Sequence, residues 1–421
     1  MTTKKMVSRS VAWLCLGGAT LPFSVGAQGY SPGIKLNGLT ISPYVNVELG
    51  YDSNIVLDHD RKLKDGYLRA NPGVDFSHQG NEWGLAGSLW YSYAWYGEYE
   101  QKDYSRWGGS LRAYRESVKG WQLVGSIGYV ESDQNDSWYY SDAGDGVWRN
   151  RRQFDGTVGL SYAFNQRFSA GLNLMYSDMW WGNKNNELGN LYGWSQWKVG
   201  GEISYRLTER YRALLSASYQ EYYSDYDSMQ VLFDDFGTPY TINRTTGRTS
   251  RNYTLMGGFM SDLTERIRYR ALGGASLYEY GGTMSMAPSY SLDATWAINK
   301  RWAATITGAG YFQPSERTFE QKRTIYTIAG GLTYMPVERL TLKLDGIYRG
   351  EENQSANAYK LSGYTANYSR NQYTARFRAS YRLQKYVSVY GSAEYTYQDS
   401  NRSQKDQWER YLLTVGLSLR Y

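Results

Sequence analysis

The sequence predicts an all-β protein, a transmembrane antiparallel up-and-down β-barrel of about 18 strands. Three observations predict it: strict alternation of apolar and polar residues over 411–421, a recurring unit of strand, turn and strand, and an unusual composition. The 421 residues include 43 Tyr, 15 Trp and 45 Gly, and the mean hydropathy is −0.62. Only every second residue of a barrel strand faces lipid, so low mean hydropathy is compatible with a membrane protein.

The first 27 residues are expected to be a secretory signal peptide. Basic residues precede an apolar run at 11–21, and small residues lead to a cleavage site between Ala27 and Gln28. The single cysteine, Cys15, lies within this segment. The rest of the chain therefore needs neither a disulfide nor a thiolate nucleophile.

The strands are predicted from a repeated hairpin unit, of which 162–176 is one copy. Eight short turns alternate with nine longer connections, which gives eighteen strands. The alternative is sixteen, because Pro43 and Pro72 interrupt the first two strands. Short periplasmic turns and long extracellular loops are typical of outer-membrane barrels. We therefore expect a short periplasmic segment at 28–40 and the barrel over 41–421.

The last strand resembles the C-terminal assembly signal of Gram-negative outer-membrane barrels. Its residues of one parity are apolar and end on an aromatic residue, whereas those of the other parity are mostly polar. The resemblance implies that the barrel assembly machinery is a partner. The residues that carry this signal are Tyr411, Leu413, Val415, Leu417, Leu419 and Tyr421.

Charged residues of one parity predict a wet lumen. In the strand at 370–383, four arginines share one face, and each would be destabilising by about 2–4 kcal/mol if it faced lipid near the midplane. A basic surplus on a pore wall favours anions. The alternative is that the charges neutralise one another across strands, as Arg376 and Glu394 could. The pore-lining candidates are Arg112, Lys198, Glu202, Arg206, Arg212, Arg268, Arg270, Lys343, Asp345, Arg376, Arg378 and Glu394.

Aromatic residues within the long connections are candidates for glycan contact, whereas those at strand ends fit an interfacial girdle. The connection at 223–250 is either a lid or constriction loop or an extended hairpin. The glycan-contact candidates are Trp138, Tyr139, Tyr140, Trp180 and Trp181.

Residues with catalytic chemistry are sparse. The two histidines, His59 and His78, are predicted on opposite rims and cannot meet. No grouping has zinc-ligand spacing, no phosphate-binding loop motif occurs, and no clustered basic module indicates nucleic acid. We expect no enzyme activity, no cofactor and no metal.

The segment Gly50-Tyr51-Asp52-Ser53-Asn54 resembles the end of the first strand in the β-barrel porin type 2 family. The resemblance implies an outer-membrane protein of a Gram-negative bacterium, in contact with lipid and lipopolysaccharide. Some members look associated with exopolysaccharide production and export.

We therefore expect a passive channel for hydrophilic solutes, namely a poly- or oligosaccharide linked to exopolysaccharide secretion, with a periplasmic export partner. Two alternatives remain open. One is a non-conducting structural or adhesive barrel. The other is a lipid or glycan hydrolase that would use His59.

Overall fold

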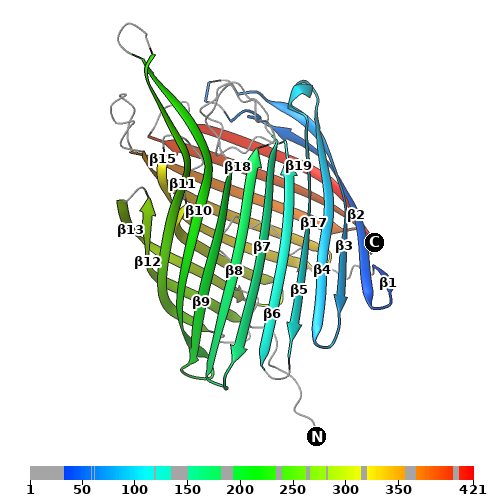
Figure 1. Cartoon of the computed structure of the whole chain (residues 1–421). Coiled ribbons are helices and arrows are strands. Elements are labelled where there is room, and N and C mark those ends of the chain that lie inside the picture. The colour runs from blue at the N-terminus through cyan, green and yellow to red at the C-terminus, as the bar shows by residue number, and fades with distance from the viewer. Residues whose placement is uncertain are drawn as a thin grey trace.

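The computed structural model describes residues 33–57, 59–60, 62–117, 120–133, 150–181, 193–233, 239–261, 266–280, 283–313, 320–355, 367–401 and 407–421. Eighteen antiparallel strands, β2 to β19, form a closed barrel in which each strand pairs with its neighbour in sequence (Figure 1). The last strand, β19, pairs with β2 and closes the wall. The predicted fold class is confirmed, with eighteen strands rather than sixteen.

The wall strands are β2 (Leu39–Asp52), β3 (Asp65–Gln79), β4 (Trp83–Tyr96), β5 (Tyr104–Glu116), β6 (Trp121–Ser132), β7 (Arg151–Ala163), β8 (Phe168–Trp181), β9 (Trp194–Arg206), β10 (Tyr211–Phe233), β11 (Pro239–Ser261), β12 (Ile267–Tyr280), β13 (Thr283–Ala297), β14 (Trp302–Gln313), β15 (Glu320–Val337), β16 (Leu340–Ser355), β17 (Asn367–Arg382), β18 (Val387–Ser400) and β19 (Trp408–Arg420). A three-residue strand, β1 (Ile34–Leu36), pairs with the start of β2. The short 3-10 helix η1 (Glu100–Lys102) precedes β5. Among the described residues, no helix is both long and apolar enough to cross a membrane.

The two rims of the barrel differ. Eight short turns, from β3–β4 to β17–β18, lie at one end, which we name the turn rim, and the other connections lie at the opposite end, the loop rim (Figure 1). Not every connection at the loop rim is long, because β12 ends at Tyr280 and β13 begins at Thr283. The described residues of the segment 223–250, namely 223–233 and 239–250, belong to the paired strands β10 and β11, which rise above the rim as an extended hairpin.

Side chains alternate between an outward face and a lumenal face along every strand, as strand geometry requires. The outward face carries large exposed apolar residues, including Leu49 (66% exposed), Leu172 (62%) and Val415 (69%). A water-soluble protein rarely exposes a continuous apolar belt, so this face is suited to lipid.

Three prolines within strands coincide with local interruptions of the ladders. Pro43 lies just beyond the β19–β2 ladder, and its carbonyl accepts a hydrogen bond of 3.0 Å from the Tyr421 amide. The β3–β4 pairing omits Pro72 and resumes at Gly73. The β13–β14 ladder ends at Tyr290, two residues after Pro288 in the sequence. Because proline has no amide hydrogen, it cannot donate to a neighbouring strand.

The closing junction is formed by β19, β2 and residues 53–55. Side-chain contacts hold it together at the loop-rim end of its ladder. Arg410 binds the fully buried Asp52 through both carboxylate oxygens, with Nε 2.9 Å from Oδ1. The Asn54 amide donates to Asp52 (3.0 Å), and its side-chain nitrogen donates to the Glu409 carbonyl (3.0 Å). Part of the Gly50–Asn54 segment thus ties the first connection to the last strand.

Candidate functional site

The candidate functional site is the lumenal face of the barrel. The ladder registers place all twelve predicted charge positions on the face opposite the exposed apolar belt. These positions lie on β5, β9, β10, β12, β16, β17 and β18, so they are distributed around the wall and do not converge on one point.

One cluster of charges lies on β16, β17 and β18. Arg376 binds Glu394, and Asp345 accepts from Lys343 (3.1 Å) and from Arg378 (3.4 Å). Two acidic groups therefore partner three basic groups. The charges neutralise one another across strands, as the alternative to an anion-selective wall predicted, but one basic group exceeds the acidic ones. The side chains of Lys343 and Arg378 are 42% and 47% exposed, so this surplus faces solvent.

A second cluster lies on the opposite stretch of wall, on β9, β10 and β12. Arg270 reaches across two strands to bind Glu202. Arg206 and Arg212 face each other in the register near the turn rim, and Arg268 lies two residues from Arg270. Within the described part of the chain, neither Arg206 nor Arg112 of β5 forms an ion pair.

A third cluster combines tyrosines with charge near the closing junction. Arg69 binds Glu48 (2.7 Å) and donates to the Tyr104 hydroxyl (2.9 Å), while the Tyr390 hydroxyl donates to Glu48 (3.0 Å). Sequence reasoning missed the tyrosines as lumenal groups. A signal was present, because Tyr390 has the same parity as the lumenal Glu394 on its strand.

The first connection narrows the loop-rim end of the lumen. Ile55 is 4% exposed and packs against lumenal residues of β3, β4 and β5. These residues are Tyr67, Ala94, Tyr96 and Tyr104. The tyrosine cluster and the first connection together form one side of the mouth.

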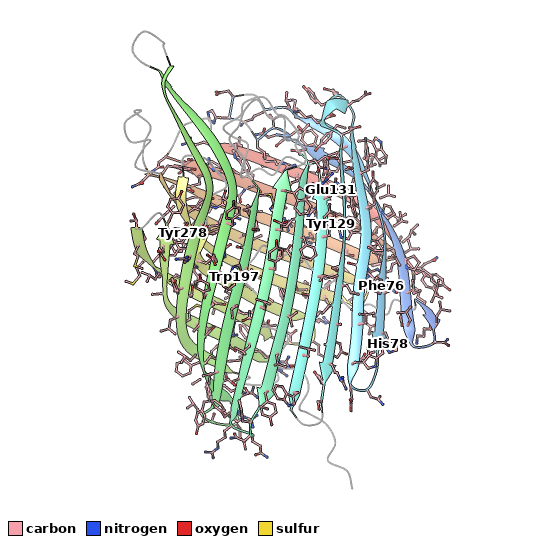
Figure 2. All side chains as sticks on the ribbon, in the orientation of Figure 1. Phe76, His78, Tyr129, Glu131, Trp197 and Tyr278 are labelled. Atoms are coloured by element: carbon pink, nitrogen blue, oxygen red, sulfur yellow. The ribbon has the colours of Figure 1, made fainter. Side chains whose placement is uncertain are left out.

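An aromatic girdle follows the outward face toward the loop rim. Ring centroids lie 5.0 Å apart in Trp107–Tyr129 and in Trp197–Tyr219 (Tyr129 and Trp197 are labelled in Figure 2). The same belt continues in Tyr219–Tyr253, Tyr348–Tyr373 and Tyr395–Tyr411, at 5.1, 5.3 and 4.8 Å.

The glycan-contact candidates do not form one surface. Trp138, Tyr139 and Tyr140 lie outside the described residues. The placement of Trp180 and Trp181 within a connection was wrong, because the β7–β8 ladder continues to the pair Arg151–Trp181. The Trp180 ring lies 6.2 Å from Tyr129, so Trp180 extends the girdle on the outward face.

The histidines lie at opposite rims. His78, on the turn rim, stacks on Trp83 with ring centroids 4.3 Å apart (Figure 2). His59 is exposed in the first connection at the loop rim. Among the described residues, no three His, Cys, Asp or Glu side chains are grouped as metal ligands would be.

The last strand presents its apolar parity outward. Tyr411, Leu413, Val415, Leu417, Leu419 and Tyr421 are between 38% and 69% exposed. The ring of Tyr421 stacks on Tyr386 at 5.2 Å, at the turn rim.

Comparison with known proteins shows the fold alone. No protein-family model and no curated protein matches the sequence. Among solved structures, the chain is similar to the FrpB iron transporter from Neisseria meningitidis, at 8% identity, with 94% of this chain and 83% of that chain covered and a TM-score of 0.50. It is also similar to the siderophore receptor PirA from Acinetobacter baumannii (9% identity, 90% and 80% covered, TM-score 0.48). The likeness concerns the closed antiparallel β-barrel fold, and the family resemblance of residues 50–54 stays a prediction.

Proposed function

We propose that the protein is an outer-membrane channel for passive passage of hydrophilic solutes, with a preference for anions. The observation that carries the proposal is the contrast between the two faces of one wall. The outward face is an apolar belt with an aromatic girdle, and the lumenal face carries charged clusters with a basic surplus. A barrel of eighteen strands is too wide for side chains alone to fill its interior.

The charges at the loop rim support contact with lipopolysaccharide headgroups. On the outward face, Arg152 binds Glu131 (3.2 Å), and Arg251 lies between Glu221 (3.6 Å) and Glu279 (3.7 Å). Glu131 lies near the loop rim in Figure 2. Charged groups above an aromatic girdle suit the interface between membrane and water. The loop rim would therefore face the outside of the cell, and the turn rim would face the periplasm.

The lumenal tyrosines support a glycan as the solute. Tyr104 and Tyr390 join aromatic rings to the Arg69–Glu48 pair, and such surfaces suit the faces and hydroxyls of sugars. The link to exopolysaccharide secretion, and with it a periplasmic export partner, rests on the family resemblance of residues 50–54.

Planar-bilayer recordings of the refolded chain in a salt gradient test this proposal. We expect stable open steps and a reversal potential of anion-preferring sign. The double variant Arg112→Gln/Arg206→Gln should shift that potential toward zero, because it removes two positive charges that have no acidic partner among the described residues.

The matched control is Arg376→Gln/Glu394→Gln, which removes both members of one ion pair and leaves the net charge unchanged. Arg376→Gln/Arg378→Gln also removes two positive charges and leaves Glu394 without its partner, so it should reduce the anion preference as well. Equal reversal potentials in all the variants would contradict anion selection by these groups. Block by an anionic oligosaccharide, but not by a neutral one of equal size, would identify the solute class.

The second candidate is a non-conducting structural or adhesive barrel. It is favoured by the first connection packing into the lumenal mouth and by the β10–β11 hairpin rising above the rim. Correctly folded protein that stays silent in the bilayer, yet binds cell surfaces through its loop rim, would support it.

A further inference from the structure

The charges of the lumenal wall differ between the two ends of the barrel. Toward the loop rim, two acid–base pairs are buried in the wall. Arg410 binds Asp52, which is fully buried, and Arg323 lies 3.6 Å from Glu351, with side chains 4% and 2% exposed. A buried pair of opposite charges presents little net charge to a solute in the lumen.

Near the turn rim, a first row of basic residues lies on β9, β10 and β12. Arg206 ends β9 and lies directly opposite Arg212 of β10. Arg268 is the second residue of β12 and shares the lumenal parity of Arg270. Like charges directly opposite each other destabilise a sheet. A bound anion would offset this cost.

A second row lies on β16, β17 and β19, on another stretch of the same rim. Lys343 lies directly opposite Arg378, which is again a pair of like charges. Arg382 ends β17 and is exposed, and Arg420 ends β19. The side chain of Arg420 stays 47% exposed although it binds Asp75. We name the two rows together the basic vestibule.

Acidic groups are fewer at this end of the lumen. Among the described lumenal positions within five residues of the turn-rim ends of the strands, the acidic residues are Asp75, Glu116, Glu202 and Asp293. Asp75 and Glu202 are each bound by an arginine, and Asp293 lies directly opposite Arg270. The basic vestibule therefore keeps a positive surplus.

The lumen is also more open at this end. Lys343, Arg378 and Arg420 are 42%, 47% and 47% exposed. By contrast, lumenal side chains near the loop rim are at most 3% exposed on strands all around the wall. These side chains are Tyr67, Met179, Tyr278, Ile325 and Gln398 (Tyr278 is labelled in Figure 2). A large solute therefore reaches the basic vestibule from the turn rim before it meets the narrow end.

We propose that the basic vestibule captures an acidic glycan, whose charges recur along the chain, and that this glycan enters the barrel at the turn rim. The inference rests on the proposed channel function and adds the class of solute and the end at which it enters. Guanidinium groups form strong hydrogen bonds with carboxylates. Two rows on separate stretches of the wall bind several charges of one polymer at once, whereas a small anion gains nothing from the second row. The site lies inside a barrel, so it fits a single chain better than a folded acidic protein.

Single-channel recordings with an oligogalacturonate in one compartment at a time test the proposal. The voltage is always set to drive anions into the channel from that compartment. We expect block from one side at a concentration about ten-fold lower than from the other, because only one end of the lumen carries the two rows. Arg206→Gln/Arg212→Gln and Arg378→Gln/Arg382→Gln should each remove most of this difference.

The matched control is Arg115→Gln/Lys300→Gln. It also removes two basic groups from the turn rim, but Arg115 is on the outward face, paired with Trp83, and Lys300 lies in a turn. The control should keep the one-sided block. Loss of this block in the control, but not in the two vestibule variants, would place the glycan outside the lumen and overturn the proposal.

Equal block from both sides of an anion-preferring channel would overturn entry at the turn rim and leave the proposed function intact. If the folded barrel does not conduct, calorimetric titration of the barrel in nanodiscs with the same oligogalacturonate decides. Affinity about ten-fold weaker in the vestibule variants than in the control would support the basic vestibule. Equal affinity in all of them would overturn it.

Discussion

The β19–β2 and β13–β14 junctions have ladders of similar length, with nine and eight register pairs, yet they differ beyond the last pair. At the loop-rim end of the first, Asp52 of the last pair joins Arg410 and Asn54 beyond it in a buried polar network that ties the chain ends together. Beyond the second, Pro288 ends the pairing and two aromatic rings fill the space behind it. Ladder length therefore does not decide whether a junction is sealed toward the loop rim; the side chains beyond the ladder do.

The difference follows from chemistry at single positions. A buried carboxylate with a bidentate arginine has a fixed geometry, because leaving either charge unpartnered is costly. The Phe312 ring has no such requirement, since it carries no polar group and can move without stranding one. The closing junction is therefore expected to be more rigid than the β13–β14 junction toward the loop rim.

Asp52→Ala should have the largest effect on the closing junction. It leaves Arg410 without its carboxylate, and breaking a buried pair from one side costs about 3–5 kcal/mol. The free energy of unfolding, measured by urea titration in micelles, should fall by that order. The control is Asp75→Ala, whose pair with Arg420 is 39% and 47% exposed and so contributes about 1 kcal/mol or less. Similar losses in the two variants would show that the closing junction has no special role.

Gly416→Ala should disturb the same junction less. A methyl group at Gly416 would overlap the ring of Tyr390 and push its hydroxyl away from Glu48. Overpacking of this kind costs about 1–3 kcal/mol. Gly346→Ala, where no atom lies near the added Cβ, serves as the control and should leave the unfolding midpoint unchanged. If Gly416→Ala unfolds at the same midpoint as the control, the Tyr390 ring can move aside without loss of stability.

Pro288→Val should have the smallest effect on stability of the three variants and should extend the β13–β14 ladder. It restores an amide hydrogen, so pairing with β14 can extend, with a gain of about 1 kcal/mol per bond. The free energy of unfolding, measured by urea titration in micelles, should rise by that order. An unchanged free energy of unfolding would show that Pro288 does not limit this ladder.

Much of the fold could be predicted because strand alternation is local. The parity of Arg370–Arg382 alone identified the lumenal face, and the repeated turns gave the strand number. Proline cannot donate a hydrogen bond to a neighbouring strand, and this made the first two predicted strands uncertain. The same holds for Pro288, beside which the β13–β14 ladder ends. At Pro43 and Pro72 neighbouring pairs compensate, and only the three-dimensional ladder shows which interruptions are repaired.

The candidate site was only partly predictable. Parity gave the face of each charged residue, but the partners depend on which strands lie two or three apart, as for Arg270 and Glu202. Asp52 stood out only as part of a family-like segment, because its partner Arg410 lies at the other end of the sequence. The end of β8 was predicted too early in the sequence, because polar and aromatic residues at the end of a strand resemble those of a loop.

Hydrogen–deuterium exchange of the full barrel in lipid nanodiscs would test the contrast between the two junctions most directly. The account predicts slow exchange of the amides of β19 from Leu412 to Arg420. Odd-numbered residues of β13 donate toward β12, as Ala297 does, so the Met286 amide faces β14 beyond the last pair, Tyr290–Gly310, and should exchange faster than the Tyr290 amide. Exchange at Met286 should slow in Pro288→Val. Protection at Met286 equal to that of β19 would contradict a β13–β14 ladder that ends at Tyr290.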